Sequence, residues 1–388
     1  MAERSYFDWN ATTPLRPQAS EAFQAALAVP GNPSSVHAEG RAARHLVEEA
    51  REAVAALVGA RASDVVFTSS GTEANMLALT AAIETAAERR PREKLLISAI
   101  EHASVRTGGR FPREAVADIA VDAEGRVDLN ALRDALAGTA RPLVSIMAAN
   151  NETGVVQPVA EAAVFIHDAG GLLHVDAVQA AGRISCDIGA LGADLLTLSA
   201  HKIGGPKGVG ALIRAREDIH FPEPLIRGGG QERGLRAGTE NVAGIAAFGA
   251  AAAAAREHGQ AEAARMRALR DSLETGLKAV APAAVVFGAG TARLPNTTLF
   301  AAPGMKAETA VIAFDLEGIA VSSGAACSSG KVQPSHVLAA MGVSAPLTRG
   351  AVRLSLGWTT SETDIARFLN AWRKLATALS KGQAGLAA

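Results

Sequence analysis

The chain has 388 residues, 48% of them hydrophobic and 20% charged, which is typical of a soluble globular protein with a large core. Its 38 Lys and Arg residues nearly balance 39 Asp and Glu residues, and a net charge of −1 does not favour nucleic acid or an anionic membrane as a partner. The N-terminus has no signal-like apolar stretch, the run 242–255 is too short to span a bilayer, and two cysteines form no disulfide framework, so we expect a cytoplasmic protein.

Short apolar runs alternate with longer alanine-rich stretches through the first two thirds of the chain. The runs predict strands at 65–69, 95–98, 144–148, 172–176, 195–199 and 208–213. Helices are expected in the gaps, including 72–89, 129–137 and 159–169. This alternation predicts an α/β fold with a mostly parallel sheet covered on both faces.

The pattern changes near Thr239, where a capping signal precedes a predicted helix to about Glu257. A second, charged helix is expected over 261–280, followed by strands at 297–301 and 352–356 and a last helix after Ser361. We therefore predict a large domain of residues 15–260, and a smaller α+β domain formed by 1–14 and 261–388.

Two polar residues end neighbouring predicted strands. Lys202 follows the strand ending in Ser199, within Ser199-Ala200-His201-Lys202, and precedes a glycine-rich turn. A lysine in that position suits a desolvated amine that forms a Schiff base. Asp176 ends the other strand, and a carboxylate for the pyridinium nitrogen with an amine for the aldehyde is what pyridoxal phosphate (PLP) requires. The alternative for Asp176 is a plain helix N-cap.

A phosphate site is predicted where Ser70-Gly71-Thr72-Glu73 follows a strand and opens a helix. Glycine permits close backbone approach, and the helix N-terminus offers free N–H groups, so Gly71 and Thr72 suit a phosphate. A simple capping box with Ser70 or Thr72 as the cap is the alternative, and Asp176 and Lys202 in the same chain favour the phosphate.

Three further side chains lie where they could contact a flat cofactor. His102, just beyond the strand 95–98, could stack on a ring and move protons, although taken alone an ordinary loop histidine is favoured. Asn151, in a turn after the strand 144–148, could bind the cofactor's phenolic oxygen or a substrate carboxylate. Gln179, three residues after Asp176, can reach the same ring.

Arginines indicate an anionic ligand. Arg353 lies inside a strand pattern and suits the α-carboxylate of an amino acid, with a structural salt bridge as the alternative. The glycine-rich segment 227–239 carries three arginines and suits an anion-facing loop, with a solvated linker as the alternative.

The two cysteines differ in their surroundings. Cys327 lies among Ser, Gly and Ala in 321–330, which suits a mobile thiol in a loop of about 322–333, with an incidental exposed cysteine as the alternative. Cys186 lies between apolar residues at strand-like spacing and is interpreted as structural.

Together these segments resemble a cysteine desulfurase of the NifS/IscS type, a class V aminotransferase-like, fold-type I PLP enzyme. The likeness covers nearly the whole chain, and the segment ending in Cys327 is its most specific part. It is carried by Asp8-Trp9-Asn10-Ala11-Thr12-Thr13-Pro14, Gly31-Asn32-Pro33, Gly71-Thr72-Glu73, Asn150-Asn151-Glu152, Asp176-Ala177-Val178-Gln179, His201-Lys202, Arg236-Ala237-Gly238-Thr239, Ser322-Ser323-Gly324-Ala325-Ala326-Cys327 and Arg353-Leu354-Ser355-Leu356-Gly357.

The resemblance implies a large domain with a mostly parallel seven-stranded sheet, a homodimer and a defined role for each residue. Lys202 would bind PLP as a Schiff base, Asp176 would pair with the ring nitrogen, and His102 would stack on the ring. Asn151 and Gln179 would contact the ring's oxygen side. The phosphate would be held by Gly71, Thr72, Ser199 and His201, with Thr239 from the other subunit.

The resemblance also implies the reaction, the conversion of L-cysteine to L-alanine. Arg353, helped by Asn32 or Asn151, would bind the substrate carboxylate. Cys327 would accept the sulfur as a persulfide and pass it to an Fe–S scaffold or another acceptor protein. No metal site is expected, and a transient contact of Cys327 with an Fe–S cluster on a scaffold stays open. Two departures concern the acceptor side: Ala325 stands where the family often has Ser, and the chain ends soon after its last helix.

Three alternatives remain at this point. A selenocysteine lyase or a small-amino-acid aminotransferase would use the same cofactor, but a transaminase needs no mobile thiol. A non-catalytic sulfur carrier or assembly partner would not need Lys202, Asp176, His102 and Cys327 together.

Overall fold

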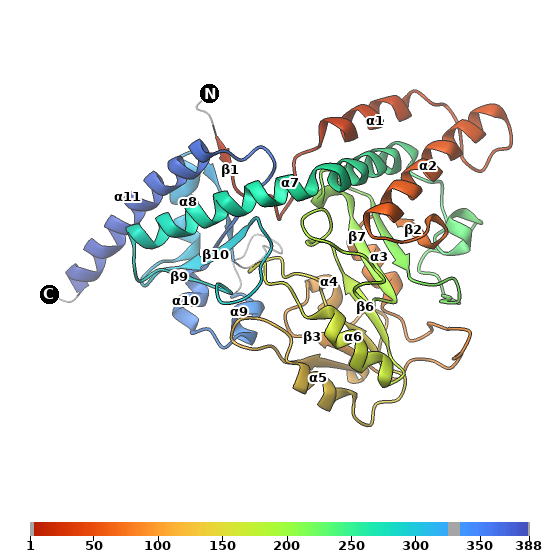
Figure 1. The fold of residues 1–388 in the computed structure, drawn as a ribbon, viewed down its shortest axis with the longest axis horizontal. Coiled ribbons are helices and arrows are strands. Elements are labelled where there is room, and N and C mark those ends of the chain that lie inside the picture. Colours follow the sequence, from red (N-terminus) through yellow and green to blue (C-terminus); the bar gives the residue numbers. More distant parts are fainter. Residues whose placement is uncertain (1–3, 325–333, 387–388) are drawn as a thin grey trace.

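The larger of two main sheets has seven strands, most of them parallel, in a computed structural model that describes residues 4–324 and 334–386 (Figure 1). Only β8 runs antiparallel to its neighbours β2 and β7. The predicted mostly parallel α/β fold is thereby confirmed. The strand order is β2 (Val65–Thr68), β8 (Gly210–Arg214), β7 (Leu195–Ser199), β6 (Leu172–Asp176), β5 (Leu143–Ser145), β3 (Leu95–Ser98) and β4 (Val116–Ile119).

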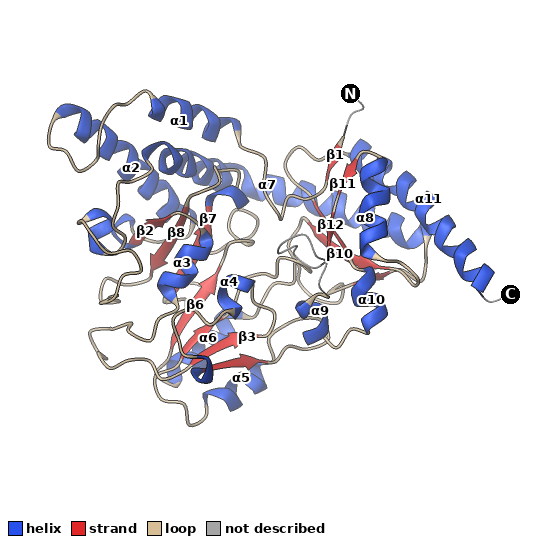
Figure 2. Ribbon diagram, turned by 180° about the vertical axis from the view of Figure 1, so that it is seen from behind, coloured by secondary structure: helices blue, strands red, loops and turns tan. Residues whose placement is uncertain are grey.

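Strand alternation supplies a core to each face of this sheet. In β7, Leu196 and Leu198 pack into one apolar cluster, whereas Leu195 packs into another on the opposite face. The first cluster lies against α2 (Ala38–Leu57), α6 (Val159–Asp168) and α7 (Val242–Val280), and the second against α3 (Gly71–Ala78). Burial on both faces explains the nearly continuous apolar runs of the sequence. Helices α1 (Pro17–Leu27), α4 (Ala103–Arg106) and α5 (Leu129–Leu136) complete this part (Figure 2).

The predicted helix over 72–89 is wrong beyond Ala78, where α3 ends. The Leu79 carbonyl accepts the Arg110 N–H at 2.8 Å instead of continuing the helical ladder. The hydroxyl of Thr80 accepts the Ala82 N–H at 3.3 Å, which favours a turn. Hydrogen bonds to Arg110 and within the turn therefore end the helix at a point where the alanine-rich sequence predicts that it continues.

The predicted division between two helices near residue 260 is also wrong, because α7 is continuous from Val242 to Val280. It packs against α1 and α2 in its first half and against α11 (Glu362–Leu386) in its second (Figure 1). At Gly259 a Cβ atom would approach the Gly182 carbonyl oxygen to 3.1 Å, so the small residue permits a close helix contact instead of a helix end. The domain boundary near 260 falls inside this helix, and the two-domain division stays a prediction.

The second main sheet is antiparallel and has the strand order β12 (Ser322–Ser323), β13 (Val352–Ser355), β10 (Thr297–Ala301) and β9 (Val285–Val286). Aromatic residues from β10, α8 (Ala307–Leu316) and α11 form its core, where Phe300, Phe314, Phe368 and Trp372 are almost fully buried. The short helices α9 (His336–Ala340) and α10 (Ala345–Gly350) lie beside it.

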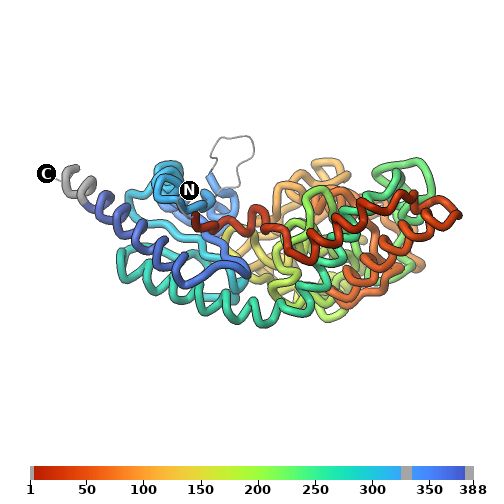
Figure 3. Tube along the Cα trace, turned by 90° about the horizontal axis from the view of Figure 1, so that it is seen from above, coloured from red at the N-terminus to blue at the C-terminus, as the bar shows by residue number. Residues whose placement is uncertain are grey.

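The N-terminal segment joins the two parts. Strand β1 (Ser5–Tyr6) pairs in parallel with β11 (Ile319–Ala320) near the second sheet, and the chain then crosses to the first (Figure 3). On the way the Thr13 N–H donates to the His201 carbonyl at 2.9 Å, and the Arg16 N–H donates to the Gly204 carbonyl at 2.8 Å. No helix in the described parts of the chain is long and apolar enough to cross a membrane.

A buried carboxyl group also fastens the two parts. The hydroxyl of Ser335, the N-cap of α9, donates to Glu152 Oε2 at 2.5 Å. Glu152 is only 2% exposed, and its burial raises the pKa of its carboxyl to about 7, although the Ser335 hydrogen bond and Arg353 oppose that rise. The next residue, His336, contacts the Glu101 carbonyl oxygen through Nε2 at 2.9 Å.

Glu152→Gln should therefore stabilise the protein increasingly as the pH rises. The pKa of Glu152 in the folded protein lies above the ordinary 4.5, so wild-type stability falls as the pH rises from 4.5 to about 7. Above pH 7 the full cost of ionising this buried carboxyl is present. The variant's advantage in free energy of unfolding should approach about 3 kcal/mol above pH 7 and vanish near pH 4. Urea unfolding at several pH values measures it, with the exposed Glu52→Gln as the control; a gap independent of pH would contradict the assignment.

Candidate active site

A cavity of about 550 Å³ lies between the two sheets. Most of the residues predicted as ligands line it together. These are Gly71, Thr72, His102, Asn151, Asp176, Gln179, Ser199, His201, Lys202 and Arg353. Asp8, Asn10, Ser70, Asn75, Ser104 and Ser322 also line it.

The parallel sheet explains why Asp176 and Lys202 meet. Strands β6 and β7 are neighbours, with Asp176 opposite Thr197 in the register, so both strands end at the same edge of the sheet. Asp176 is the last residue of β6, and Lys202 lies one short turn beyond Ser199, the last residue of β7. The carboxyl edge of such a sheet is where ligands bind.

The amine of Lys202 is held by the backbone of the N-terminal segment. Its Nζ donates to the carbonyl oxygens of Asn10 at 2.6 Å and Ala11 at 2.8 Å. Burial, reinforced by the positive charges of Arg353 and Arg183, lowers the pKa of Lys202 to about 7. A substantial fraction of this lysine is therefore the neutral amine at neutral pH, the form that attacks an aldehyde.

The phosphate-type site forms at the start of α3. A Cβ atom on Gly71 would lie 3.1 Å from Val178 Cγ2 and 3.3 Å from Ser199 Cβ, so glycine is needed for this close approach. The hydroxyl of Ser70 caps the helix by accepting the Glu73 N–H at 3.1 Å. The capping interpretation is thus confirmed for Ser70, whereas Gly71 and Thr72 line the cavity and their phosphate role stays a prediction.

Asp176 and His102 are joined through two residues that sequence reasoning did not assign. Asn75 Nδ2 donates to Asp176 Oδ2 and to Ser104 Oγ, each at 2.9 Å. Ser104 Oγ lies 2.8 Å from His102 Nδ1. Burial lowers the pKa of His102, so its imidazole is neutral near pH 7 although one side faces the cavity.

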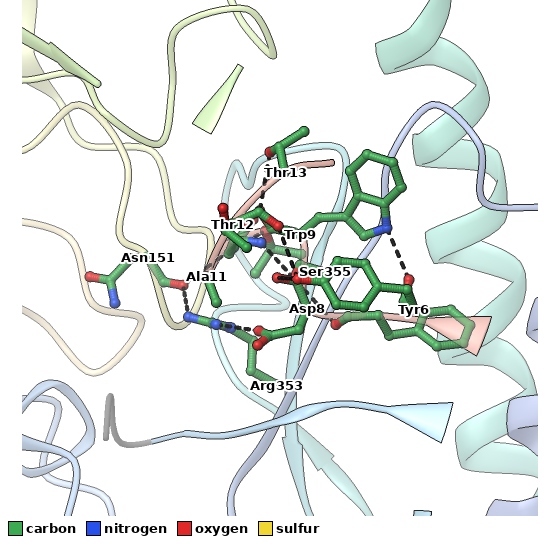
Figure 4. A network of polar contacts seen from close by, with 12 residues as sticks. Tyr6, Asp8, Trp9, Ala11, Thr12, Thr13, Asn151, Arg353 and Ser355 are labelled. Carbon is green, nitrogen blue, oxygen red and sulfur yellow. Dashed lines mark hydrogen bonds and ion pairs between the residues drawn. The ribbon is translucent and has the colours of Figure 1, made fainter. Parts of the chain in front are cut away.

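Arg353, on β13, has an anionic partner within the chain (Figure 4). Its Nη2 donates to Asp8 Oδ1 and its Nη1 to the Asn151 carbonyl oxygen, at 2.8 and 2.9 Å. Its Nε is buried and has no hydrogen-bond partner among the described residues. The structural salt bridge considered from the sequence therefore exists, and Arg353 lines the cavity as well.

Gln179 and His201 already have protein partners. The Gln179 side-chain amide donates to the Asn10 carbonyl at 3.0 Å and accepts from Arg183 at 2.5 Å. His201 Nδ1 lies 3.2 Å from the Thr12 hydroxyl, and burial lowers the pKa of His201 to about 4. Both side chains are thus oriented by the N-terminal segment and its neighbours.

Three predicted site residues are not placed in this cavity. Thr239 is exposed and does not line it, and Asn32 is exposed in a turn, where its Oδ1 accepts the Ser34 N–H at 2.9 Å. Cys327 lies outside the described residues, but Ser322, in the preceding strand β12, lines the cavity. The structural interpretation of Cys186 is confirmed, because it is 3% exposed in the core and burial raises its pKa to about 12.

Several lining residues escaped the sequence analysis for identifiable reasons. Asn75 and Ser104 look like ordinary helical polar residues, and only their shared contact with Asp176 or His102 distinguishes them. Asn10 and Ala11 act through backbone carbonyls, which no side-chain pattern reveals. The spacing of Asn75, three and four residues after Thr72 and Gly71, was the one available signal, because it places Asn75 one helical turn along α3.

Comparison with known proteins assigns the family. Residues 5–368 match the aminotransferase class-V family. The chain belongs to this family. Its class-V membership agrees with the fold and with a lysine and an aspartate at the carboxyl ends of adjacent strands.

Similar proteins include a cysteine desulfurase from Cereibacter sphaeroides, 46% identical over 95% of this chain and 94% of that relative. Among solved structures, a NifS-like protein from Rickettsia africae has a TM-score of 0.86 at 38% identity, covering 96% of this chain and 99% of its own. A structure described as SspA in complex with cysteine has a TM-score of 0.76 at 28% identity, covering 92% of this chain and 100% of its own. These agree with the family predicted from the sequence.

The lowered pKa of Lys202 predicts how this class-V protein reacts with an aldehyde. The rate at which added PLP couples to the apoprotein should rise with pH and reach half its maximum near pH 7, because only the neutral amine reacts. Visible absorption measures the coupling, and Lys202→Ala shows the background from other lysines. A rate that keeps rising up to pH 10 would contradict the burial argument.

Proposed function

We propose that this chain is a cysteine desulfurase that converts L-cysteine to L-alanine with PLP, Cys327 taking the sulfur as a persulfide. The observation that carries the proposal is one cavity lined by an amine, a carboxylate and a guanidinium, on Lys202, Asp176 and Arg353. The first two suit the cofactor, and the third suits an amino-acid substrate. Relatives named cysteine desulfurase at 40–46% identity support this choice of reaction.

The residues of the cavity fit PLP by their chemistry. The N-terminus of α3 with Thr72, Ser199 and His201 would hold the phosphate, and Lys202 would hold the aldehyde as a Schiff base. Asp176 would face the ring nitrogen, and the Asn75 hydrogen bond keeps that carboxylate in place. Asn151 and Gln179 would lie on the oxygen side of the ring. When bound, PLP supplies an electron sink for the pair of electrons left on Cα.

Lys202 would remove the Cα proton of the substrate. An amine whose pKa is about 7 is an efficient base at neutral pH because part of it is unprotonated. The carbonyls of Asn10 and Ala11 would receive the ammonium that results, since both already accept hydrogen bonds from Nζ. Asp176 is buried close by, and its negative charge favours the protonated amine.

Arg353 would bind the substrate carboxylate. Arg353 lines the cavity, its Nη groups donate to Asp8 and Asn151 (Figure 4), and its buried Nε has no partner among the described residues. Binding an anion there would compete with the Asp8 contact, so substrate selection is coupled to the N-terminal segment. Asn151 would help through its side-chain amide. Asn32 does not line this cavity, so its role in binding the substrate carboxylate stays a prediction from the family resemblance.

Cys327 would attack the substrate sulfur as a thiolate. An S–S bond forms, the substrate Cβ–S bond breaks, and its electron pair returns to the carbon skeleton, which is released as alanine after protonation. His102 would move the protons of the thiols. Cys186 cannot substitute, because it is buried in the core with its pKa raised to about 12.

We further propose a cytoplasmic homodimer in which Thr239 of each subunit completes the phosphate site of the other. The exposure of Thr239, outside the cavity of its own chain, is compatible with that role. The persulfide would pass to an Fe–S scaffold or another sulfur acceptor. Capture of persulfide-transfer partners from native extract, compared with Cys327→Ser, would identify the acceptor.

Lys202→Ala should lose the visible absorption of lysine-bound PLP and its sensitivity to borohydride, because no other lysine lines the cavity among residues 4–324 and 334–386. Activity should fall by roughly 10³-fold or more, since both the covalent link and the base are removed. The exposed Lys207→Ala is the matched control and should keep both properties. An unchanged, borohydride-sensitive band in Lys202→Ala would overturn the assignment.

Cys327→Ser should bind PLP normally but form no persulfide with L-cysteine, because the hydroxyl is a far weaker nucleophile towards sulfur. Mass spectrometry of the intact protein after mixing with cysteine measures the added sulfur, and Cys186→Ala should still acquire it. Normal desulfuration by Cys327→Ser would show that another group is the acceptor.

Product analysis separates the alternatives. Alanine and sulfide from cysteine in the presence of a reductant support the desulfurase. Transamination with pyruvate and no sulfide would favour an aminotransferase, and turnover of selenocysteine alone would favour a selenocysteine lyase. A protein that binds no PLP but carries sulfur would support the non-catalytic alternative.

A further inference from the structure

Four polar side chains form a continuous hydrogen-bonded chain from Asp176 to His102. Asn75 on α3 bridges Asp176 Oδ2 and Ser104 Oγ through its Nδ2, at 2.9 Å each. Ser104 Oγ continues to His102 Nδ1 at 2.8 Å. Asn75, Ser104 and Asp176 are at most 8% exposed, so water cannot readily replace these contacts.

The direction of every hydrogen bond in this chain is determined. An ionised carboxylate only accepts, so the Asn75 amide must turn its nitrogen to Asp176, and its second N–H then points to Ser104. Because Ser104 Oγ accepts from Asn75, its own proton is directed to His102 Nδ1. The backbone N–H of Ser104 also donates to Nδ1, at 3.2 Å. His102 Nδ1 is therefore an acceptor and carries no proton.

The orientation of the Asn75 amide leaves its oxygen without a hydrogen-bond partner among the described residues. This oxygen, Oδ1, is also buried. Leaving a buried acceptor unpaired costs on the order of 1–3 kcal/mol. The amide keeps that orientation because the reverse one would place its oxygen against the Asp176 carboxylate.

We propose that Asn75 and Ser104 are positioning residues that hold His102 as the neutral imidazole with its proton on Nε2. Among the described residues no hydrogen bond engages Nε2, so this N–H is the polar group that the ring offers to the cavity. Any additional proton would have to enter at Nδ1 and would break both hydrogen bonds from Ser104. His102 therefore begins the reaction as a hydrogen-bond donor through Nε2.

The charged and titratable neighbours of His102 do not change this conclusion. Burial, reinforced by the charge of Lys202, outweighs the opposing charge of Asp176 and lowers the pKa of His102. Burial and the charge of Asp176 raise the pKa of the fully buried Glu101 well above its ordinary value, which favours its uncharged form. His336 of α9 has its pKa lowered by burial and adds no positive charge near pH 7.

The role of His102 in catalysis rests on the proposed function, whereas the position of its proton does not. NMR therefore tests the proton position, and kinetics test the role in catalysis. Nitrogen-15 NMR of ring-labelled histidine in the PLP-loaded protein, with His102→Gln for assignment, reports which nitrogen carries the proton. We expect the Nε2–H tautomer in the wild type and in Ser104→Thr, which keeps the hydroxyl. Ser104→Ala should raise the pKa of His102 toward its ordinary value, because the neutral form loses one hydrogen bond.

Thr107→Ala is the matched control, since within the described part of the chain its hydroxyl hydrogen-bonds to the Ser104 carbonyl alone, at 3.4 Å. It should leave the His102 resonances unchanged. An Nδ1–H tautomer in the wild type, or an unshifted His102 titration in Ser104→Ala, would overturn the proposal. The apoprotein gives the same readout if the protein binds no PLP, so failure of the proposed function would leave the result interpretable.

Kinetics then test the role in the reaction. Ser104→Ala should lower kcat/KM with cysteine about fivefold, the change that one hydrogen bond is worth, and should shift the acid limb of the pH profile upward. Ser104→Thr should restore both. A merely structural role for Ser104 would lower thermal stability without moving the pH profile, and that outcome would contradict the proposal.

Discussion

The parallel pairing of β6 and β7 is the constraint on which the candidate active site depends. Their register places Asp176 beside Thr197, so the carboxylate and the turn that carries Lys202 emerge at one edge of the sheet. Both strands are buried on both faces. A slip of one residue in their pairing would move each side chain to the opposite face of the sheet and disrupt its packing there. The apolar cores thus fix the geometry of the polar site, and Ala149 and Met147 from these cores also line its cavity.

The N-terminal segment supplies hydrogen-bond partners for Lys202 and Arg353. It crosses between the two sheets and offers the carbonyls of Asn10 and Ala11 to the Lys202 amine and the Asp8 carboxylate to Arg353. Because these are charged or charge-accepting groups in a partly buried cavity, each needs a specific partner to offset its loss of water. The segment therefore connects Lys202 and Arg353 through one short stretch of chain, whose contact with Arg353 is drawn in Figure 4.

Burial is also the common cause of the unusual protonation states around the cavity. Lys202 and Glu152 both have pKa values of about 7, one lowered and the other raised, because loss of water disfavours the charged form of each. Burial also raises the pKa of Glu101 and lowers the pKa values of His102 and His201, so it favours the neutral form of each side chain. Such shifts suit proton transfer at neutral pH, and they cost stability that the two cores must supply.

The sequence by itself determined the α/β class, the strands that carry Asp176 and Lys202, and most of the polar residues that line the cavity. These predictions succeeded because strands buried on both faces leave continuous apolar runs, and because polar residues that follow such strands meet at the carboxyl edge of the sheet. The same local logic identified Cys186 as a packed thiol, since an apolar neighbourhood indicates burial, whereas the interpretation of Cys327 stays a prediction.

Tertiary structure decided the features that depend on contacts between distant segments. Arg110 ends α3 early, and packing against two parts of the protein keeps α7 continuous where its composition suggested a break. The roles of Asn75 and Ser104 arise only when α3, α4 and β6 converge, because a hydrogen bond's direction depends on which partners are present and not on the residue type. Residue type specifies which chemistry is available; the three-dimensional arrangement of donors and acceptors selects the proton's position.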